Sequence, residues 1–167
     1  LAHEYAEELK ALIGHCIAED SGGLTPSDVP LAKLTQEQLD ALPIPVREIE
    51  NIYLLTPMQQ GILFHSLQDD VYVNQTSVPV KGLDIERFIA AWKEAIKAHA
   101  LLRTSFHTGS LLGEPLQVVH RMAEMDLQVL DWNHLDHGES LDRIDQQAEK
   151  DRQHGFSLSH APLLRLT

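Results

Sequence analysis

Apolar residues recur every three to four positions in three parts of the chain, and this spacing predicts three amphipathic helices. The first covers residues 3–18, and the clearest covers residues 85–99 behind an Asp84 cap. A more polar helix runs from Ser140 to about His154. We expect the apolar side of each helix to pack in a core.

Two capping boxes predict two shorter helices. In each, a threonine is followed three residues later by a glutamine, so the hydroxyl and the amide satisfy backbone N–H groups reciprocally. One box spans residues 35–38 and the other residues 56–59, where Pro57 occupies the first helical position. Between them, the prolines of residues 43–45 predict an extended linker.

Short apolar or alternating runs predict six strands. The runs are residues 52–55, 72–80, 101–107, 115–120, 127–130 and 162–167. Together with the helices they give the order β-α-β-α-β-β-β-α-β after residue 48. This order indicates an α+β (mixed α/β) fold.

Composition narrows the class of protein. The 167 residues are 43% hydrophobic, enough for a packed core, and carry a formal net charge of −12. That charge argues against a nucleic-acid or anionic-membrane partner, since phosphates would repel it. No apolar run approaches the roughly 20 residues that cross a bilayer, and no secretory signal is visible. The single cysteine, Cys16, excludes an internal disulfide framework and favours a reducing compartment, so we expect a cytoplasmic protein.

The two ends of the chain indicate part of something longer. The chain begins at Leu1 rather than at a methionine, and it ends in the alternating run 163–167 without a turn residue. Residues 1–50 carry ten acidic and only three basic side chains, so the first third also differs in charge. We therefore expect an excised fragment with a distinct N-terminal segment.

Ten histidines prompt a search for a metal site. His134 and His137 lie three residues apart beside Asp131 and Asp136, but in an expected loop without a further ligand cluster. Protein metal sites need three or four ligands of fixed geometry. A solvated loop is therefore favoured, and we expect no metal in this chain.

Two other pairs have ordinary explanations. His15 and Cys16 are adjacent on a helix and point in different directions, which favours a packed thiol over a Cys–His nucleophile. His65 and Asp69 are favoured as an exposed surface pair. The residues alone therefore leave the function of this acidic fragment open.

Two stretches carry a resemblance to a known family. Residues 52–67, with the string Leu-Thr-Pro-Met-Gln-Gln-Gly-Ile-Leu-Phe-His, resemble the first conserved motif of condensation domains in nonribosomal peptide synthetases. Residues 98–106 resemble the second, usually Arg-His-x-x-Leu-Arg-Thr-x-Phe, with Ala98 in place of the first arginine. The matching motif positions are Thr56, Pro57, Met58, Gln59, Gly61, Phe64, His65, His99, Thr104 and Phe106.

An earlier stretch, residues 15–34, is similar to the tail that closes epimerization domains of the same synthetases. We therefore expect residues 1–45 to be such a tail with its linker, and residues 46–167 to be the N-terminal part of a condensation domain. The first motif is also similar to the subtype that accepts a D-configured donor residue. Such domains follow epimerization domains, so the two resemblances agree.

The resemblance implies a chloramphenicol acetyltransferase-like fold, of which this chain holds an incomplete N-terminal lobe. It implies that the amine of an acceptor attacks the thioester of a donor, both tethered to phosphopantetheine on carrier proteins. Carrier proteins and neighbouring domains are then the partners, and the chain itself binds no cofactor. The family's catalytic motif, His-His-x-x-x-Asp-Gly, is absent because the chain has no His-His dipeptide. We expect no catalytic residue here and an inactive isolated chain.

Arg103 is the residue expected to support the site. The resemblance implies that it pairs with the aspartate of the absent motif, which leaves it without a partner in this chain. The alternative is a surface arginine at the start of a strand. Tyr53 and His65 stay open as tunnel or core residues. Because a missing second lobe would expose apolar surface, we also expect dimerisation or aggregation.

Two other functions stay open. An epimerization or dual-function domain of the same superfamily would have a different first motif. A non-catalytic module that only docks carrier proteins or neighbouring domains would have lost the catalytic motif in the parent protein.

Overall fold

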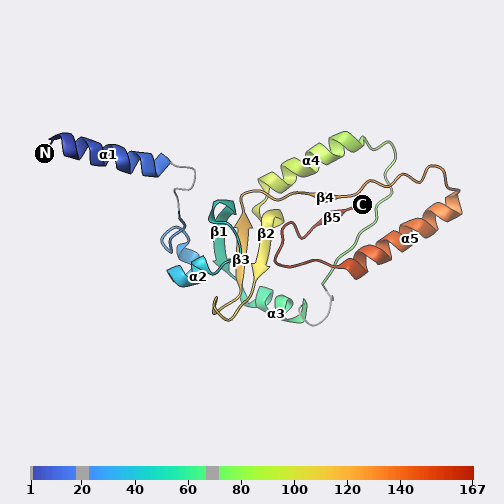
Figure 1. Cartoon of the computed structure of the whole chain (residues 1–167). Coiled ribbons are helices and arrows are strands. Elements are labelled where there is room, and N and C mark those ends of the chain that lie inside the picture. Colours follow the sequence, from blue (N-terminus) through green and yellow to red (C-terminus); the bar gives the residue numbers. More distant parts are fainter. Residues whose placement is uncertain (1, 18–22, 67–71) are drawn as a thin grey trace.

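The computed structural model describes residues 2–17, 23–66 and 72–167 and has a small antiparallel sheet near its centre (Figure 1). Helices and short strands are mixed along the chain, which confirms the expected fold class. None of the helices in the described part of the chain is long and apolar enough to span a membrane.

The central sheet has three strands in the order β1-β3-β2. They are β1 (Ile49–Leu54), β2 (Thr104–His107) and β3 (Leu116–His120). In the antiparallel register, Val118 lies opposite both Ile52 and Ser105. Because side chains alternate between the two faces of a sheet, these three residues form a row on the same face.

A second sheet holds the last strand of the chain. It pairs β4 (Asp126–Leu127) with β5 (Arg165–Leu166) in parallel. Both strands are shorter than the expected runs 127–130 and 162–167. The expected strands therefore exist, but their ends are set by the few residues that find a partner.

Five α-helices lie in the described residues. They are α1 (Ala2–Ile17), α2 (Gln36–Asp40), α3 (Pro57–Ser66), α4 (Ile85–Ala98) and α5 (His137–His154). Three 3-10 turns lie between these elements: Pro30–Ala32 between α1 and α2, Val46–Glu48 before β1, and Ala100–Arg103 before β2.

Both predicted capping boxes are confirmed. The backbone N–H of Thr35 donates to Gln38 Oε1 at 2.9 Å, and the hydroxyl of Thr35 accepts from the Gln38 N–H at 3.3 Å. Thr56 and Gln59 repeat the arrangement at 2.9 and 3.4 Å. Asp84 caps α4 as expected, by accepting from a backbone N–H three residues later.

The start of the last helix was predicted wrongly. α5 begins at His137, and its cap is Asp136 rather than Ser140. Asp136 Oδ1 accepts from the Glu139 N–H at 2.9 Å, and the Glu139 carboxylate accepts from the Asp136 N–H at 3.2 Å. An aspartate followed three residues later by a glutamate is itself a capping box, so the sequence contained the correct signal.

The expected strand at residues 72–80 does not form: this stretch is extended but pairs with none of the described strands. Val78 and Val80 are 68% and 58% exposed. Alternation of apolar side chains stabilises a strand only when a neighbouring strand and a buried face are available. The observed order after residue 48 is therefore β-α-α-β-β-β-α-β.

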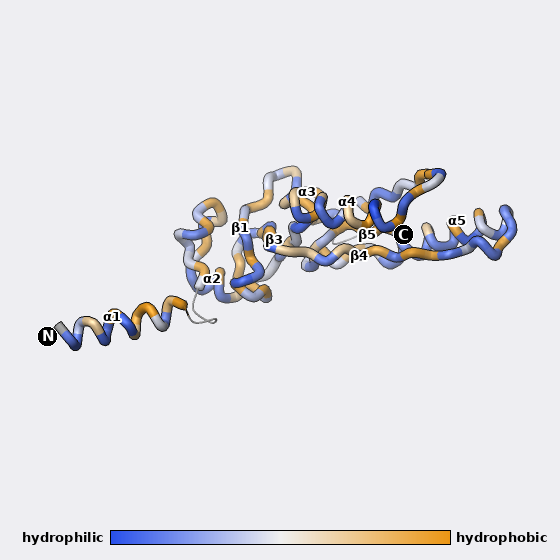
Figure 2. The backbone as a smooth tube through the Cα atoms, turned by 90° about the horizontal axis from the view of Figure 1, so that it is seen from above, coloured by the Kyte–Doolittle hydropathy of each residue, from blue (hydrophilic) through white to orange (hydrophobic). Residues whose placement is uncertain are grey.

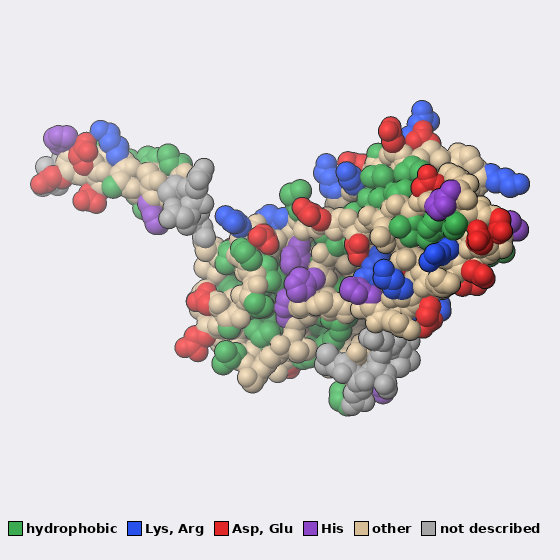
Figure 3. Space-filling view, turned by 45° about the vertical axis from the view of Figure 1, so that its right-hand side comes forward, with side chains coloured by type: hydrophobic (Ala, Val, Ile, Leu, Met, Phe, Trp, Pro, Cys, Tyr) green, Lys and Arg blue, Asp and Glu red, His purple; other side chains and the backbone are tan. Residues whose placement is uncertain are grey.

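The first helix stands apart from the other described segments (Figures 1 and 2). In the space-filling view it forms a separate arm (Figure 3). Tyr5 is 72% exposed, and Cys16 is exposed as well. The expectation of a packed apolar side with a packed thiol was wrong, because α1 has an amphipathic pattern but none of the described segments covers it.

The apolar side of α4 is only partly covered. Ile96 is buried, whereas Ile85 is 47% exposed. Phe88 and Trp92 touch edge to face, with 6.3 Å between ring centroids, and both are half-buried. The expected core stripe is therefore buried only at its C-terminal end, where the chain turns into the sheet.

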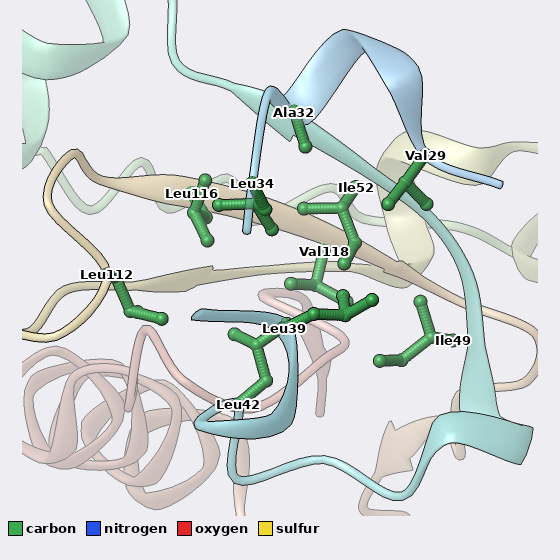
Figure 4. Packing of buried hydrophobic residues seen from close by; sticks show 10 residues of the cluster. All are labelled: Val29, Ala32, Leu34, Leu39, Leu42, Ile49, Ile52, Leu112, Leu116 and Val118. Carbon is green, nitrogen blue, oxygen red and sulfur yellow. The ribbon is translucent and has the colours of Figure 1, made fainter. Parts of the chain in front are cut away.

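The core lies on one face of the central sheet, and residues from before the sheet complete it (Figure 4). Three of its best-buried members, Ile52, Leu116 and Val118, are fully buried strand residues. The cluster comprises Val29, Ala32, Leu34, Leu39, Leu42, Ile49, Ile52, Leu112, Leu116 and Val118.

Candidate functional site

Arg103 lies at a junction of three elements, in the turn before β2. Its Nη1 atom is 2.5 Å from Oε2 of Glu50 on β1. The same atom donates to the backbone carbonyls of His120 and, at 3.3 Å, of Arg121. Its Nε donates to the carbonyl of Ile96 in α4 at 3.0 Å. One guanidinium thus joins α4, β1 and the end of β3.

Burial of Arg103 tests the surface alternative for this residue. Its exposed fraction is 6%, so it is not a surface arginine. Within this chain, Glu50 supplies the opposite charge. A buried guanidinium is costly without acceptors, and this fold supplies them from its own backbone as well.

Beside this junction, Ser105 is enclosed between two imidazoles. Its Oγ lies 2.8 Å from His107 Nε2 and 2.7 Å from His120 Nε2, and it has no exposed surface. A hydroxyl has one proton to donate, so at most one imidazole accepts from Ser105, and a ring that does not accept donates its N–H to the hydroxyl oxygen. Two neutral rings with complementary tautomers satisfy both contacts.

The surroundings lower the pKa of both imidazoles. Burial lowers the pKa of His107, and the nearby His120 and His160 lower it further. Burial also lowers the pKa of His120, with His160 adding to the effect and the Glu48 carboxylate opposing it. Protonation of either ring would place a charge in the polar end of the core.

The first motif is tied to the sheet through the cap of α3. Gln59 Oε1 accepts from the backbone N–H and the hydroxyl of Thr56 at 2.9 and 3.0 Å. The Gln59 amide donates to Gln117 Oε1 on β3 at 3.2 Å, and the Gln117 amide donates to the Leu54 carbonyl at 3.2 Å. With Pro57 at the first position of the helix, these contacts fix where α3 begins.

Other residues of the first motif face outward. Met58 is 77% and Phe64 60% exposed. Phe64 contacts His65 edge to face at 5.7 Å between ring centroids. At Gly61, a Cβ would meet no described neighbouring atom within 4 Å, so packing does not require glycine here. The helix therefore presents these motif residues without joining them to Arg103.

More residues of the second motif are held by contacts at the sheet. Thr104 is buried, and its hydroxyl donates to the Ala100 carbonyl at 2.9 Å. Phe106 is half-buried, and its backbone N–H donates to the Leu158 carbonyl at 2.7 Å. His99 is exposed at the C-terminal end of α4. The arginine, threonine and phenylalanine of this motif are thus placed by the sheet, whereas its histidine is not.

Arg165 anchors the last strand. Its Nε donates to Asp126 Oδ2 at 2.9 Å, and its other nitrogens donate to the carbonyls of Asp151 and Gly155 at 3.3 and 3.2 Å. The guanidinium lies 5.1 Å from the centre of the Phe156 ring, a cation–π contact. Beside it is an open cavity of about 320 Å³.

No metal site is formed by the described residues, which contain no group of three or more histidine, cysteine or acidic side chains placed to hold an ion. His134 and His137 are exposed. The expected pair of His65 with Asp69 lies partly outside the described residues. The arrangement around Arg103 and Ser105 can support and orient a neighbouring segment, but it offers no accessible nucleophile.

Comparison with known families identifies the chain. The profile of the condensation domain matches residues 49–167, more than half of the sequence. The chain belongs to the condensation-domain family, as the two motifs predicted.

The chain spans only a small part of the length of the relatives it matches. Over its whole length it is 45% identical to one subunit of linear gramicidin synthase from Brevibacillus parabrevis, and it covers 3% of that relative. It is 41% identical, again over its whole length, to another subunit of the same synthase, of which it covers 2%. A subunit of mycosubtilin synthase from Bacillus subtilis is 38% identical over 95% of the chain and 6% of the relative.

Sequence reasoning missed Glu50, Ser105, His107, His120 and Gln117. A signal existed for two of them, because Ser105 and His107 are two apart in a predicted strand and therefore share a face. The partners of Arg103 carried no such signal. Glu50 and the His120 carbonyl come near Arg103 through the pairing of distant strands.

Proposed function

We propose that the parent protein is a nonribosomal peptide synthetase and that this chain is part of a domain forming its peptide bonds. The amine nitrogen of a carrier-bound acceptor attacks the carbonyl carbon of a carrier-bound donor thioester. The C–N bond forms, the C–S bond breaks, the amine loses a proton and the donor carrier regains its thiol. The match of residues 49–167 to the condensation domain carries this proposal.

The substrates in this proposal are aminoacyl or peptidyl groups on the phosphopantetheine arms of carrier proteins. The partners are those carrier proteins and neighbouring domains of the synthetase. The 167 residues themselves hold no cofactor and no metal in this proposal. A cytoplasmic location agrees with the single cysteine and with substrates delivered by carrier proteins.

The isolated chain is proposed to be inactive, because it contains no His-His dipeptide and hence no His-His-x-x-x-Asp-Gly motif. The second histidine of that motif is the family's candidate for positioning or deprotonating the amine. The test mixes loaded donor and acceptor carrier proteins with either the parent synthetase or the 167-residue chain. Dipeptide formation by the parent alone supports the proposal, and a measurable rate with the short chain contradicts it.

Arg103 is proposed to support the catalytic loop by pairing with the aspartate of that motif in the parent. Burial of its guanidinium and its fixed position before β2 support this role. In the parent, Arg103→Gln is expected to lower the rate of condensation. Unchanged binding of the carrier proteins would separate this support from a docking role.

The domain division is also a proposal. We propose that residues 1–45 carry the tail of an epimerization-like unit with its linker and that residues 46–167 begin the condensation unit. We also propose the D-accepting subtype, because the motif string in residues 55–65 is similar to that of this subtype. Parent synthetase that condenses a D-configured donor faster than its L-isomer would support the subtype, and the reverse preference would overturn it.

The exposed apolar residues of α1 and α4 support dimerisation of the isolated chain. Light scattering of the 167-residue chain at high concentration tests this proposal. A clean monomer would contradict it.

Two alternative functions can be distinguished from condensation by the products that an assay detects. Inversion at the α-carbon of a carrier-bound residue without amide formation would indicate an epimerization or dual-function domain. Carrier binding with neither product would indicate a docking module.

A further inference from the structure

Residues 24–45 form a layer over one face of the central sheet, and we call them the covering segment. Val29 and Ala32 are each 1% exposed and Leu39 is 3% exposed, which is the burial expected of core residues. Leu39 belongs to the same buried cluster as Val118, a residue of β3 (Figure 4). These residues precede the stretch that matches the condensation domain, which starts at residue 49.

The sheet depends on this layer for its burial. Ile52 and Val118 have no exposed surface, although they lie on the face of a sheet only three strands wide. A sheet face of that size is not shielded by its own strands and needs a second layer. In the core cluster, that layer is supplied by Val29, Ala32, Leu34, Leu39 and Leu42.

A long-range hydrogen bond fixes the covering segment in place. Gln38 Nε2 donates to the Leu112 carbonyl at 3.1 Å, across 74 positions of sequence. The loop there approaches closely: a Cβ at Gly113 would lie 3.3 Å from the same Gln38 nitrogen, and Gly113 has a φ of +77°. Both the space and the backbone conformation therefore favour glycine at this point.

We propose that the covering segment is a built-in docking element, seated on the β1–β3 face, so that the linker proposed within residues 1–45 is folded onto the condensation unit from about residue 24 onward. The segment carries apolar residues at the positions that the sheet face requires, and its capping box places Leu39 and Gln38 toward the sheet and its loop. A second consequence rests on the junction proposed above between an upstream unit and the condensation unit. The seated segment fixes the point at which an upstream unit is joined to the condensation unit.

Hydrogen exchange of the full chain, measured by mass spectrometry of peptides, tests the proposal. Leu39→Ala is expected to accelerate exchange in both the covering segment and β1 and β3, on the order of tenfold or more. Leu31→Ala is the matched control, because Leu31 lies in the same segment but is 65% exposed. It is expected to leave exchange in the sheet unchanged.

A milder pair of variants guards against loss of the whole fold. Gln38→Glu keeps the oxygen that caps the Thr35 N–H but removes the donor to Leu112. Gln36→Glu adds the same charge to α2, but the partners of the Gln36 amide among the described residues, Leu24 and Asp40, both lie within the covering segment. Faster exchange around residues 112–116 with Gln38→Glu, and not with Gln36→Glu, supports the tether.

These exchange experiments test the role of the covering segment and do not test the proposed reaction. If Leu39→Ala accelerates exchange only in residues 24–45, the covering segment is a separate unit and the proposal fails. The same holds if Leu31→Ala and Leu39→Ala act alike on the sheet. Since exchange in this chain does not depend on peptide bond formation, such a failure would leave the proposed reaction untouched.

Discussion

Glu50 and Arg103 form an ion pair with one exposed and one buried end. Their closest atoms are 2.5 Å apart, while the side chains are 42% and 8% exposed. The guanidinium also holds backbone carbonyls of α4 and β3, whereas the Glu50 carboxylate remains open to water. The two ends of this pair therefore differ in what their removal leaves behind.

Arg103→Ala is expected to destabilise the chain by about 3 kcal/mol, because buried carbonyls lose their donor. Glu50→Gln is expected to cost less than about 1 kcal/mol, since its partly exposed end is screened by water and the amide can still accept a hydrogen bond. Urea unfolding followed by circular dichroism measures both. Equal losses would mean that the ion pair, rather than the backbone contacts, accounts for the effect.

Stability is expected to fall as the pH is lowered below about 6.5, the ordinary pKa of histidine. The pKa values of His107 and His120 are lowered in the fold, so the unfolded chain takes up protons first and unfolding is favoured. The loss ends once the pH is below the lowered pKa values. The urea midpoint of unfolding, measured at pH of about 8 and about 5.5, tests this. As a control, His134→Gln replaces an exposed histidine and should leave the difference between the two midpoints unchanged. A midpoint that rises on acidification would contradict the neutral state of the pair.

Ser105→Ala is expected to cost about 1–3 kcal/mol, because it leaves two enclosed imidazole nitrogens without their shared partner. Ser159→Ala removes an exposed hydroxyl and is expected to change stability by less than about 0.5 kcal/mol. The comparison uses the same unfolding measurement at pH of about 8. Similar losses of stability in the two variants would mean that the Ser105 hydroxyl contributes no more than an exposed one.

Asp136→Ala is expected to cost about 1 kcal/mol, since it removes the cap of α5. Asp136→Asn retains an oxygen acceptor and should therefore keep most of the stability that Asp136→Ala loses. Ser140→Ala, at the position that the sequence pattern favoured as the helix start, is expected to have a smaller effect than Asp136→Ala. Thermal unfolding ranks the three variants, and a larger loss at Ser140 would contradict the observed cap.

Local chemistry explains which parts of the fold were predictable. The boxes at Thr35 and Thr56 and the cap at Asp84 need only residues within one helical turn, and the structure contains all of them. The stretch 72–80 alternates like a strand and α1 has an amphipathic pattern, but no described segment pairs with the first or covers the second. Pattern gives a segment's preference, whereas pairing and burial depend on what the rest of the chain brings near it.

The same distinction applies to the candidate site. The second motif singled out Arg103, but its Glu50 partner lies 53 positions earlier and is brought to it by folding. Ser105 and His120 belong to different strands and meet because β2 and β3 pair in a fixed register. Ser105 and His107 were within reach of sequence reasoning, since their spacing alone places them on one face.

By itself, the sequence determined the family, the mixed α/β class and most helix starts, because motifs and caps are encoded in contiguous residues. Only the tertiary structure decided that residues 24–45 cover the sheet, that Arg103 is buried with Glu50, and that Ser105 lies between two histidines. These depend on long-range packing and strand register, in which a side chain's surroundings come from segments far away in the chain.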